Sequence, residues 1–245
     1  MMTKYEENIT IPCYCTDASW RLKPVSFMNY AQEIANRHAT AIGFGYDDLI
    51  SSHTAWVLSR MHIVFHNAPL WRNNVTFYTW HKGAEGLFYL RDFLMRGKDG
   101  ETLVSATTSW LVLNLETRKL VRNPELMDEG TACMENAVGT SCGKVRLPDG
   151  CASEMVMEHV VAYSDVDMNG HTNNAMYVEW AMNAIDYEAA SGSPVRELKI
   201  NFNHETRPGD HVELYRACIE DASGQHWFVE GKVGATSAFC VEIVF

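Results

Sequence analysis

The sequence predicts an α+β fold built from two similar halves, each with one long helix and an antiparallel sheet. Two stretches of apolar residues follow the 3.6-residue period of a helix, and strand-like segments come after each of them. A polar segment precedes each helix, so the same order of elements occurs twice along the chain. Because a sheet can curl around a single helix, we expect both helices to be buried completely.

The first half is expected to begin with a helix from Pro24 to about Ile42. Its apolar residues recur at intervals of three and four, and proline is well suited to the first turn of a helix. Four strands are expected after it, separated by turns such as Arg96–Gly100. These strands span Trp56–Phe65, Asn74–Trp80, Leu87–Arg96 and Leu103–Leu115.

The second half repeats this order. Tyr177, Trp180 and Ile185 lie on one face of the second predicted helix, and Asn173 or Asn174 can cap its first turn. The last strand alternates apolar and other residues, which is typical of a sheet with one buried face. The four strands expected here span Glu197–Asn203, His211–Ile219, Trp227–Val233 and Ala238–Phe245.

The two halves can be aligned by residue number. We therefore expect an N-terminal half at 1–128, a connector of little periodicity at 129–157, and a C-terminal half at 158–245. The matched positions are Phe65 with Phe202 and Val75 with Val212, at a shift of 137, and Thr16-Asp17 with Ser164-Asp165, at a shift of 148.

The composition argues against nucleic acid and anionic membranes as partners. The chain of 245 residues carries 31 acidic and 20 basic residues, a formal charge of −11, whereas those partners require a basic face. No window holds the roughly 20 apolar residues that cross a bilayer, and the first residues lack a signal-peptide pattern. These features predict a cytoplasmic protein without membrane insertion.

The cysteines and histidines predict no metal site. The seven cysteines include no C-x-x-C pair, which favours reduced and mostly buried thiols. His62 and His66 lie in a predicted strand, where their side chains would be about 13 Å apart. Cys218 follows the alternation of an interior strand position, so we do not expect it to act as a nucleophile with a histidine.

The densest polar segment is Ser164–Asn174, immediately before the second helix. It supplies two carboxylates, three amides and an imidazole, and in an extended backbone Asp167, Asn169 and His171 would share one side. The N–H groups near Thr172 to Asn174 could stabilise an oxyanion formed from an ester or thioester. The alternative is an Asp- and Asn-rich turn that only caps the helix.

A second carboxylate could come from Glu205, in a turn after the first strand of the second half, where a glutamate is usually only solvated. The sequence contains no G-x-S-x-G elbow, no glycine-rich phosphate loop and no dinucleotide fingerprint. The sequence therefore offers few candidates for a nucleophile.

Several motifs together resemble the acyl-acyl-carrier-protein thioesterases of the plant-plastid and bacterial type. The resemblance covers most of the chain, from about Ile11 to Val212, and the motifs occur in the family's order. They are Trp56–Ile63, Pro69–Trp71, Thr79–Trp80, Arg91–Phe93, Ala106–Trp110, Asn114–Leu120 and Ser164–Asn174.

The resemblance implies a double hot-dog fold, hydrolysis of fatty acyl-acyl carrier protein, and no metal or organic cofactor. It assigns catalytic roles to Asp167, Asn169, His171 and Glu205. Plant members carry a cysteine after the glutamate where this chain has Thr206, which favours Glu205 and water over a thiol nucleophile. Partial desolvation of Glu205 would give its carboxylate useful basicity. An acyl-enzyme route with Asp167 as nucleophile is the competing mechanism.

The resemblance also implies that the N-terminal half holds the acyl chain, and basic side chains should contact the acidic carrier protein. Alternative functions are a non-hydrolytic module that binds acyl thioesters and an acyl-CoA thioesterase, and two chains could pair as a homodimer. The candidate chain-binding residues are Phe27, Met28, Tyr30, Ile34, Trp56, Leu58 and Met61. The candidate carrier-docking residues are Arg118, Lys119 and Arg122, with Arg21 and Lys23 as a second choice.

Overall fold

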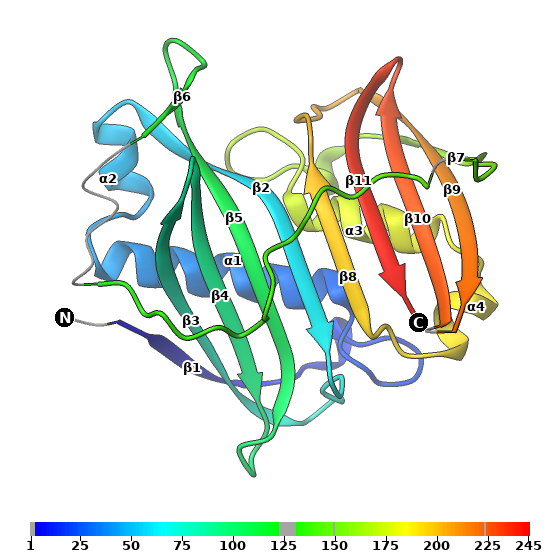
Figure 1. The fold of residues 1–245 in the computed structure, drawn as a ribbon, viewed down its shortest axis with the longest axis horizontal. Helices are drawn as coiled ribbons and strands as arrows, with labels where there is room; N and C mark the ends of the chain where they lie inside the picture. The colour runs from blue at the N-terminus through cyan, green and yellow to red at the C-terminus, as the bar shows by residue number, and fades with distance from the viewer. Residues whose placement is uncertain (1–2, 123–130, 149, 223) are drawn as a thin grey trace.

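The computed structural model describes residues 3–122, 131–148, 150–222 and 224–245. A curved antiparallel sheet forms the front layer in Figure 1, and helices α1 (Pro24–Ala41) and α3 (Asn174–Asn183) cross behind it, one in each half. This arrangement confirms the predicted α+β fold of two similar halves. The boundary predicted between residues 128 and 129 lies outside the described residues.

Each half contributes five described strands in equivalent order, and the first half adds the short β6. The first half contains β1 (Tyr5–Thr10), a 3-10 turn at Cys13–Cys15, α1, α2 (Tyr46–Ser51), β2 (Thr54–Phe65), β3 (Asn74–Glu85), β4 (Phe88–Arg96), β5 (Thr102–Asn114) and the short β6 (Leu120–Val121). The second half contains β7 (Glu154–Val160), a 3-10 turn at Tyr163–Asp165, α3, α4 (Tyr187–Gly192), β8 (Glu197–Phe202), β9 (His211–Asp221), β10 (Gly224–Val233) and β11 (Thr236–Val244).

The two halves join at the centre of the sheet. Within the described residues the strand order is β1-β3-β4-β5-β2-β8-β11-β10-β9-β7, and β6 pairs with β5. Strands β2 and β8 are antiparallel neighbours, with Met61 opposite Ile200. The eight predicted strands are all present. The edge strands β1 and β7, the two-residue β6 and the six-residue helices were not predicted, because they are too short or too polar to show a clear period. Strand β7 begins within the segment predicted as a connector.

Helix α1 is not completely buried, so that prediction is wrong. Phe27, Ile34 and His38 face the sheet and are buried, whereas Glu33 and Arg37 on the opposite side are exposed. The sheet encloses only the apolar side of the helix. Helix α3 is apolar on more of its circumference, and only Asn183 within it is exposed.

The segment that links the halves crosses the outer face of the sheet, as the green trace in Figure 1 shows. The side-chain oxygen of Asn201 accepts a hydrogen bond from the Val145 N–H at 2.7 Å, and Cys142 is buried beside it. Val145, Cys142, Phe228 and Cys240 form a small hydrophobic cluster. Residues 131–148 therefore cover apolar and polar groups of the outer face that would otherwise contact water.

The alignment of the polar segments differs from the prediction. An isolated bridge closes Thr16–Leu22 in the first half and Val166–Thr172 in the second, which gives a shift of 150 rather than 148. The Leu22 N–H donates to the Pro69 carbonyl, and the Thr172 N–H donates to the Thr206 carbonyl. Pro69 and Thr206 are 137 positions apart, so the shift of 137 after the helices is confirmed. Loop residues show no apolar period, and the sequence could not fix their register.

All seven cysteines are free, but only three of them are buried. The expectation of mostly buried thiols is therefore wrong, and so is the interior position expected for Cys218. Cys218 is exposed and lines a cavity together with Arg216 and Trp227. No helix in the described ranges 3–122, 131–148, 150–222 and 224–245 is both long enough and apolar enough to span a bilayer.

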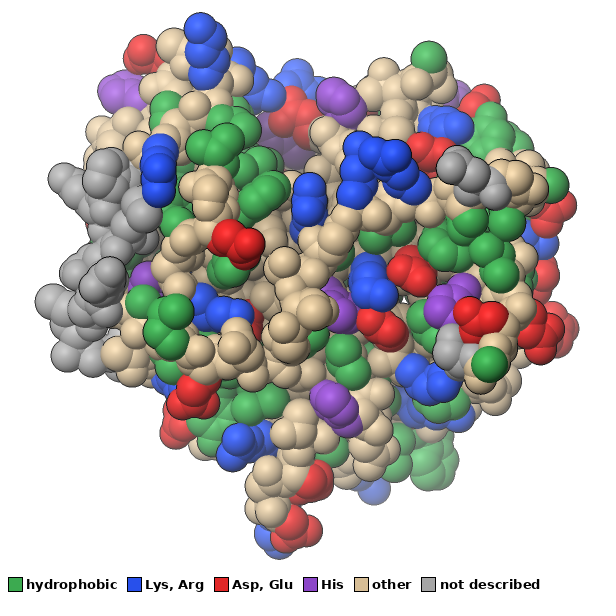
Figure 2. Space-filling model, in the orientation of Figure 1, with side chains coloured by type: hydrophobic (Ala, Val, Ile, Leu, Met, Phe, Trp, Pro, Cys, Tyr) green, Lys and Arg blue, Asp and Glu red, His purple; other side chains and the backbone are tan. Residues whose placement is uncertain are grey.

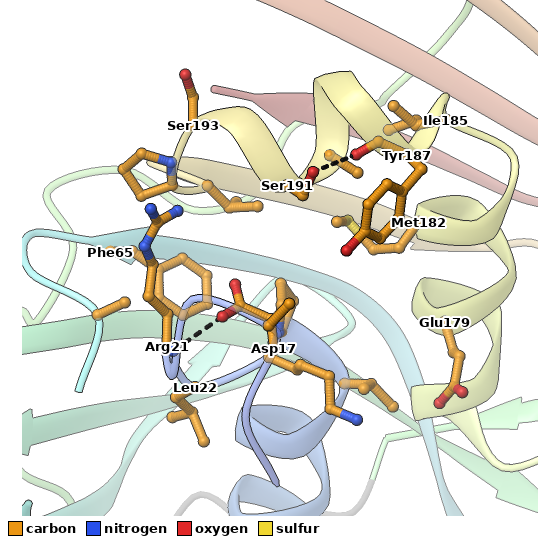
Figure 3. Close-up of a pocket in the computed structure, with 18 of the residues that line it drawn as sticks. Asp17, Arg21, Leu22, Phe65, Glu179, Met182, Ile185, Tyr187, Ser191 and Ser193 are labelled. Carbon is orange, nitrogen blue, oxygen red and sulfur yellow. Dashed lines mark hydrogen bonds between the residues drawn. The ribbon is translucent and has the colours of Figure 1, made fainter. Parts of the chain in front are cut away.

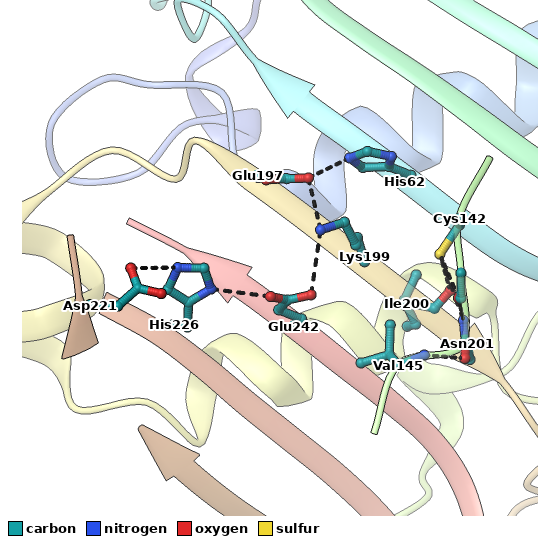
Figure 4. A network of polar contacts seen from close by, with 11 residues as sticks. His62, Cys142, Val145, Glu197, Lys199, Ile200, Asn201, Asp221, His226 and Glu242 are labelled. Carbon is teal, nitrogen blue, oxygen red and sulfur yellow. Dashed lines mark hydrogen bonds and ion pairs between the residues drawn. The ribbon is translucent and has the colours of Figure 1, made fainter. Parts of the chain in front are cut away.

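A chain of charged side chains crosses the outer face from β2 to β10 (Figure 4). Glu197 accepts from the His62 Nε2 at 2.7 Å and from the Lys199 Nζ at 2.9 Å, and Lys199 also reaches Glu242. Partial burial raises the pKa of Glu197, but the charges and hydrogen bonds of Lys199 and His62 outweigh this effect. The pKa of Glu197 therefore lies below its usual value.

We expect Glu197→Gln to reduce stability at neutral pH and to have less effect in acid. Because the folded-state pKa of Glu197 is lowered, its contribution is present above the unfolded value of about 4.3 and is lost as pH falls through the folded value. Urea unfolding of both proteins from pH 7 to pH 3 checks this. Glu6→Gln, at an exposed position of β1, is the control. An equal difference in stability at every pH would contradict the expectation.

Candidate active site

The polar segment before α3 is a tight turn, not an extended strand. The Asp167 N–H donates to the His171 carbonyl at 2.9 Å, and the Gly170 N–H donates back to the Asp167 carbonyl at 3.0 Å. Gly170 has a φ of +76°, a conformation that glycine adopts without strain. The prediction that Asp167, Asn169 and His171 share one side of an extended backbone is therefore wrong, because the glycine reverses the chain between them.

The structure brings His171 and Glu205 together. The His171 Nε2 lies 3.6 Å from the Glu205 Oε2, which is an ion-pair distance but too long for a hydrogen bond. About a third of each side chain is exposed, with 34% for His171 and 37% for Glu205, so solvent reaches the pair. A water molecule beside the pair could contact both groups.

Two arginines bind the other oxygen of Glu205. The Oε1 accepts from Arg207 at 2.7 Å and from Arg118 at 3.1 Å, and Arg118 comes from the β5–β6 hairpin of the first half. Partial burial raises the pKa of Glu205, but the hydrogen bond from Arg207 and the charges of His171, Arg118 and Arg207 outweigh it. The pKa of Glu205 is therefore below its usual value, contrary to the raised basicity expected from desolvation.

Thr206 fixes the loop that carries Glu205. Its hydroxyl is buried and lies 2.6 Å from the Thr172 hydroxyl and 3.1 Å from the Tyr177 hydroxyl. The Thr206 N–H donates to the Tyr177 oxygen, and the Thr206 carbonyl accepts from the Thr172 N–H. Thr206 thus holds Glu205 beside the first turn of α3. No pattern in the sequence indicated this role.

The two carboxylates of the polar segment have different partners. Both oxygens of Asp167 face Asn169, with 2.8 Å to its N–H and 3.3 Å to its side-chain nitrogen. Asp165 is buried and accepts from the Ala162 N–H at 2.7 Å and from the His159 Nε2 at 2.8 Å. In the described part of the chain, no hydrogen bond links the side chains of Asp167 and Asn169 to those of His171 and Glu205.

Fewer N–H groups at the start of α3 are available than the sequence suggested. The Thr172 N–H is bound to Thr206, and the Asn173 N–H donates to the Asp165 carbonyl. The Asn173 side chain caps the helix by accepting from the Ala175 N–H at 3.0 Å. Of the N–H groups of Thr172, Asn173 and Asn174, that of Asn174 has no hydrogen bond within the described residues. It lies at the positive end of the helix dipole.

The predicted chain-binding residues are mostly in tightly packed positions. Phe27, Met28, Ile34 and Met61 belong to the main hydrophobic core, and Tyr30 packs against it. Leu58 is also buried, and Trp56 packs in a separate cluster with Tyr89. An acyl chain could enter among these side chains only if some of them moved.

The predicted docking residues lie at one end of the sheet. Arg118, Lys119 and Arg122 are exposed, in or next to the β5–β6 hairpin at the top of Figure 1. Figure 2 shows Lys and Arg side chains at that end of the same face. Arg118 has a second role that the sequence did not indicate, since it contacts Glu205. Arg21 and Lys23 instead line a cavity elsewhere.

Two family models match the chain, one in each half. Residues 2–129 match the acyl-ACP thioesterase N-terminal domain, and residues 151–238 match the acyl-ACP thioesterase C-terminal domain. The first matched region contains α1, and the second contains Glu205 and the turn before α3.

Curated relatives of this chain are enzymes that act on acyl carrier protein substrates. The chain is 24% identical over 236 residues to oleoyl-acyl carrier protein thioesterase 1 of Arabidopsis thaliana, which covers 90% of this chain and 65% of the relative. It is 28% identical to the dodecanoyl-[acyl-carrier-protein] hydrolase of Cinnamomum camphora, over 74% of this chain and 50% of the relative. The chain thus spans between half and two thirds of the length of these relatives.

The fold is that of solved acyl-ACP thioesterases. An acyl-ACP thioesterase from Bacteroides thetaiotaomicron superposes with a TM-score of 0.80 at 23% identity, over 99% of this chain and 98% of the other. The 12:0-ACP thioesterase from Umbellularia californica gives 0.86 at 21% identity, over 99% and 93%. The expected double hot-dog fold is confirmed.

Proposed function

Because the chain belongs to the acyl-ACP thioesterase family, we propose that it hydrolyses the thioester of a fatty acyl-acyl carrier protein and releases the free fatty acid. Release of the chain would end its elongation. The observation that carries the proposal is the His171–Glu205 pair, 3.6 Å apart and partly exposed beside the first turn of α3. An ionised carboxylate, an imidazole and a helix N-terminus are the groups that thioester hydrolysis by water requires.

In the proposed reaction, the Oε2 of Glu205, which lies beside His171, accepts a proton from water while the water oxygen attacks the thioester carbonyl carbon. The carbon–sulfur bond then breaks, and the leaving thiolate takes up that proton, with His171 close enough to relay it. The unbonded N–H of Asn174 stabilises the oxyanion. Asp167 orients Asn169, which in turn holds the water or the substrate.

The competing route makes Asp167 the nucleophile of an acyl-enzyme. The donors on both of its oxygens support direct attack by water, because they draw charge from the carboxylate. A single turnover in ¹⁸O-labelled water tests the acyl-enzyme route, because water that attacks the Asp167 carbonyl of the anhydride leaves its label in Asp167. We expect the label in the released fatty acid and none in Asp167, whereas label in Asp167 would establish the acyl-enzyme.

The proposal is tested by hydrolysis of one acyl group carried on acyl carrier protein and on coenzyme A, repeated across chain lengths. We expect hydrolysis of both esters and a higher kcat/KM for the carrier-linked ester. A preference for coenzyme A would make the protein an acyl-CoA thioesterase. Binding without hydrolysis of either ester would make it a non-hydrolytic acyl-thioester module.

We propose that the N-terminal half receives the acyl chain and that Lys119 and Arg122 contact the acidic carrier. Arg118 is a poor choice for a docking test, because its reversal would place a carboxylate beside Glu205. We expect Lys119→Glu with Arg122→Glu to lower kcat/KM for the carrier-linked ester about tenfold at low salt. The same change should have little effect on a coenzyme A ester and a smaller effect at high salt.

The matched control reverses Arg96 and Lys98, two exposed basic residues at the end of β4 and in the following turn, at the opposite end of the sheet. Equal losses from both double variants would exclude a docking surface at the β5–β6 hairpin. A cytoplasmic location and a homodimer stay predictions, and analytical ultracentrifugation would test the second.

A further inference from the structure

The first half contains a second copy of the turn that forms the candidate active site. The Asp17 N–H donates to the Arg21 carbonyl at 2.8 Å, and the Trp20 N–H donates to the Asp17 carbonyl at 3.0 Å. These are the hydrogen bonds of the turn before α3, displaced by 150 residues. Arg21 therefore occupies the position of His171. By the shift of 137 that holds after the helices, Ala68 occupies the position of Glu205.

A cavity of about 440 Å³ opens at this second position (Figure 3), and its size is within the range of small-molecule sites. Arg21, Lys23 and Phe65 line it from the first half, and Met182 and Ile185 line it from the second. The cavity thus lies between the halves. It has an apolar part formed by these three hydrophobic side chains and a charged part at the turn.

The charged part of the cavity contains two basic side chains, Arg21 and Lys23. In the described part of the chain, neither Arg21 nor Lys23 forms an ion pair with an acidic side chain of the protein. The Asp17 Oδ1 accepts from two backbone N–H groups, at Ser19 and Arg21, whereas its Oδ2 has no hydrogen bond within the described residues. Glu179 is the other acidic side chain of the cavity. The positive end of α1 also faces the cavity, since Pro24 and Val25 line it.

The comparison of the two positions indicates what this cavity binds. At the candidate active site the Glu205 carboxylate is held by two arginines and the imidazole. At the second position Ala68 stands in place of the Glu205 carboxylate, and the Arg21 guanidinium stands in place of the His171 imidazole. The second position thus lacks a base for hydrolysis, and Ala68 provides no carboxylate for the Arg21 guanidinium.

We propose that this cavity binds a fatty monocarboxylate, with its carboxylate on the Arg21 guanidinium and its chain against Phe65, Met182 and Ile185. A guanidinium binds a carboxylate through two parallel hydrogen bonds, and the apolar side chains remove the alkyl chain from water. The choice of a fatty chain rests on the proposed function, because the released product belongs to this chemical class. Binding itself does not require hydrolysis.

The test is a calorimetric titration of the full chain with decanoate, below the concentration at which it forms micelles. We expect Arg21→Gln to weaken one binding event about tenfold or more, because it removes the charge-assisted pair. We expect Ala68→Glu to weaken the same event, because it returns the internal carboxylate that the active site has. Decanol, which has the same chain without the charge, should bind this site at least about tenfold more weakly.

The matched control is Arg146→Gln, which removes an exposed arginine from the segment on the outer face of the sheet. Circular dichroism verifies that each variant is folded. Unchanged decanoate affinity in both Arg21→Gln and Ala68→Glu, or an equal loss in Arg146→Gln, would overturn the proposal. Glu205→Gln should retain this binding event, because Glu205 does not line the cavity. Decanoate binding and thioester hydrolysis are therefore measured independently. A wild-type protein that hydrolyses no thioester would reject the proposed function but leave the binding result unchanged.

Discussion

Glu205→Gln is expected to lower kcat for thioester hydrolysis about 10²–10⁴-fold, the range that general-base catalysis contributes. Glutamine keeps the size of the side chain and can still accept from Arg118 and Arg207, but its amide cannot take a proton from water. Because 37% of the Glu205 side chain is exposed and its loop is held by Thr206, the variant should fold normally. The effect should therefore lie in turnover and not in protein yield.

Steady-state hydrolysis of one acyl-carrier substrate, with circular dichroism of both proteins, measures the effect. Glu220→Gln, an exposed glutamate of β9, is the matched control. Turnover within threefold of wild type in a folded Glu205→Gln protein would remove the carboxylate from the mechanism.

The pH dependence follows from the same residue. Only the ionised form of Glu205 can accept a proton, and its pKa is lowered by Arg207, His171 and Arg118 despite partial burial. The rate should therefore fall on the acid side only below the ordinary glutamate value of about 4.3. Arg118→Met should move this acid limb to higher pH, because it removes one of the positive charges. An acid limb that stays in place would show that Glu205 does not control it.

The fold was predictable where apolar residues recur with a period. Phe27 and Ile34 on α1, and Met61 and Ile63 on β2, are buried as their spacing indicates. The segment across the outer face has no such period, because it is held by single contacts such as the one between Val145 and Asn201. Contacts of this kind join distant residues and leave no local pattern in the sequence.

The candidate site was predictable only in part. Residue types and resemblance selected His171 and Glu205, and the structure places their side chains together. Gly170 was the available signal for the turn, since glycine after asparagine is typical of a chain reversal. Arg118 could not be inferred, because it lies 87 residues from Glu205 and reaches it only when the two halves pack.

The two aspartates of the turn before α3 look equivalent in sequence, and the structure predicts opposite consequences for their removal. Asp165→Ala should lower the free energy of unfolding by about 2 kcal/mol, because it removes two hydrogen bonds to a buried carboxylate. The Ala162 N–H and the His159 ring would then have no acceptor there. The His159 ring also packs against Trp180, with ring centroids 4.4 Å apart, so the disturbance should reach the core around α3.

Asp167→Ala should change the free energy of unfolding by less than about 0.5 kcal/mol, as at other surface positions, but reduce kcat about 10²-fold by releasing Asn169. Urea unfolding and steady-state hydrolysis of both variants give the comparison, and Asp165→Asn is the control, because its amide oxygen can still accept from the Ala162 N–H. If Asp167→Ala were the more unfolded protein, the turn would depend on Asp167, and its proposed role in orienting Asn169 could not be separated from folding.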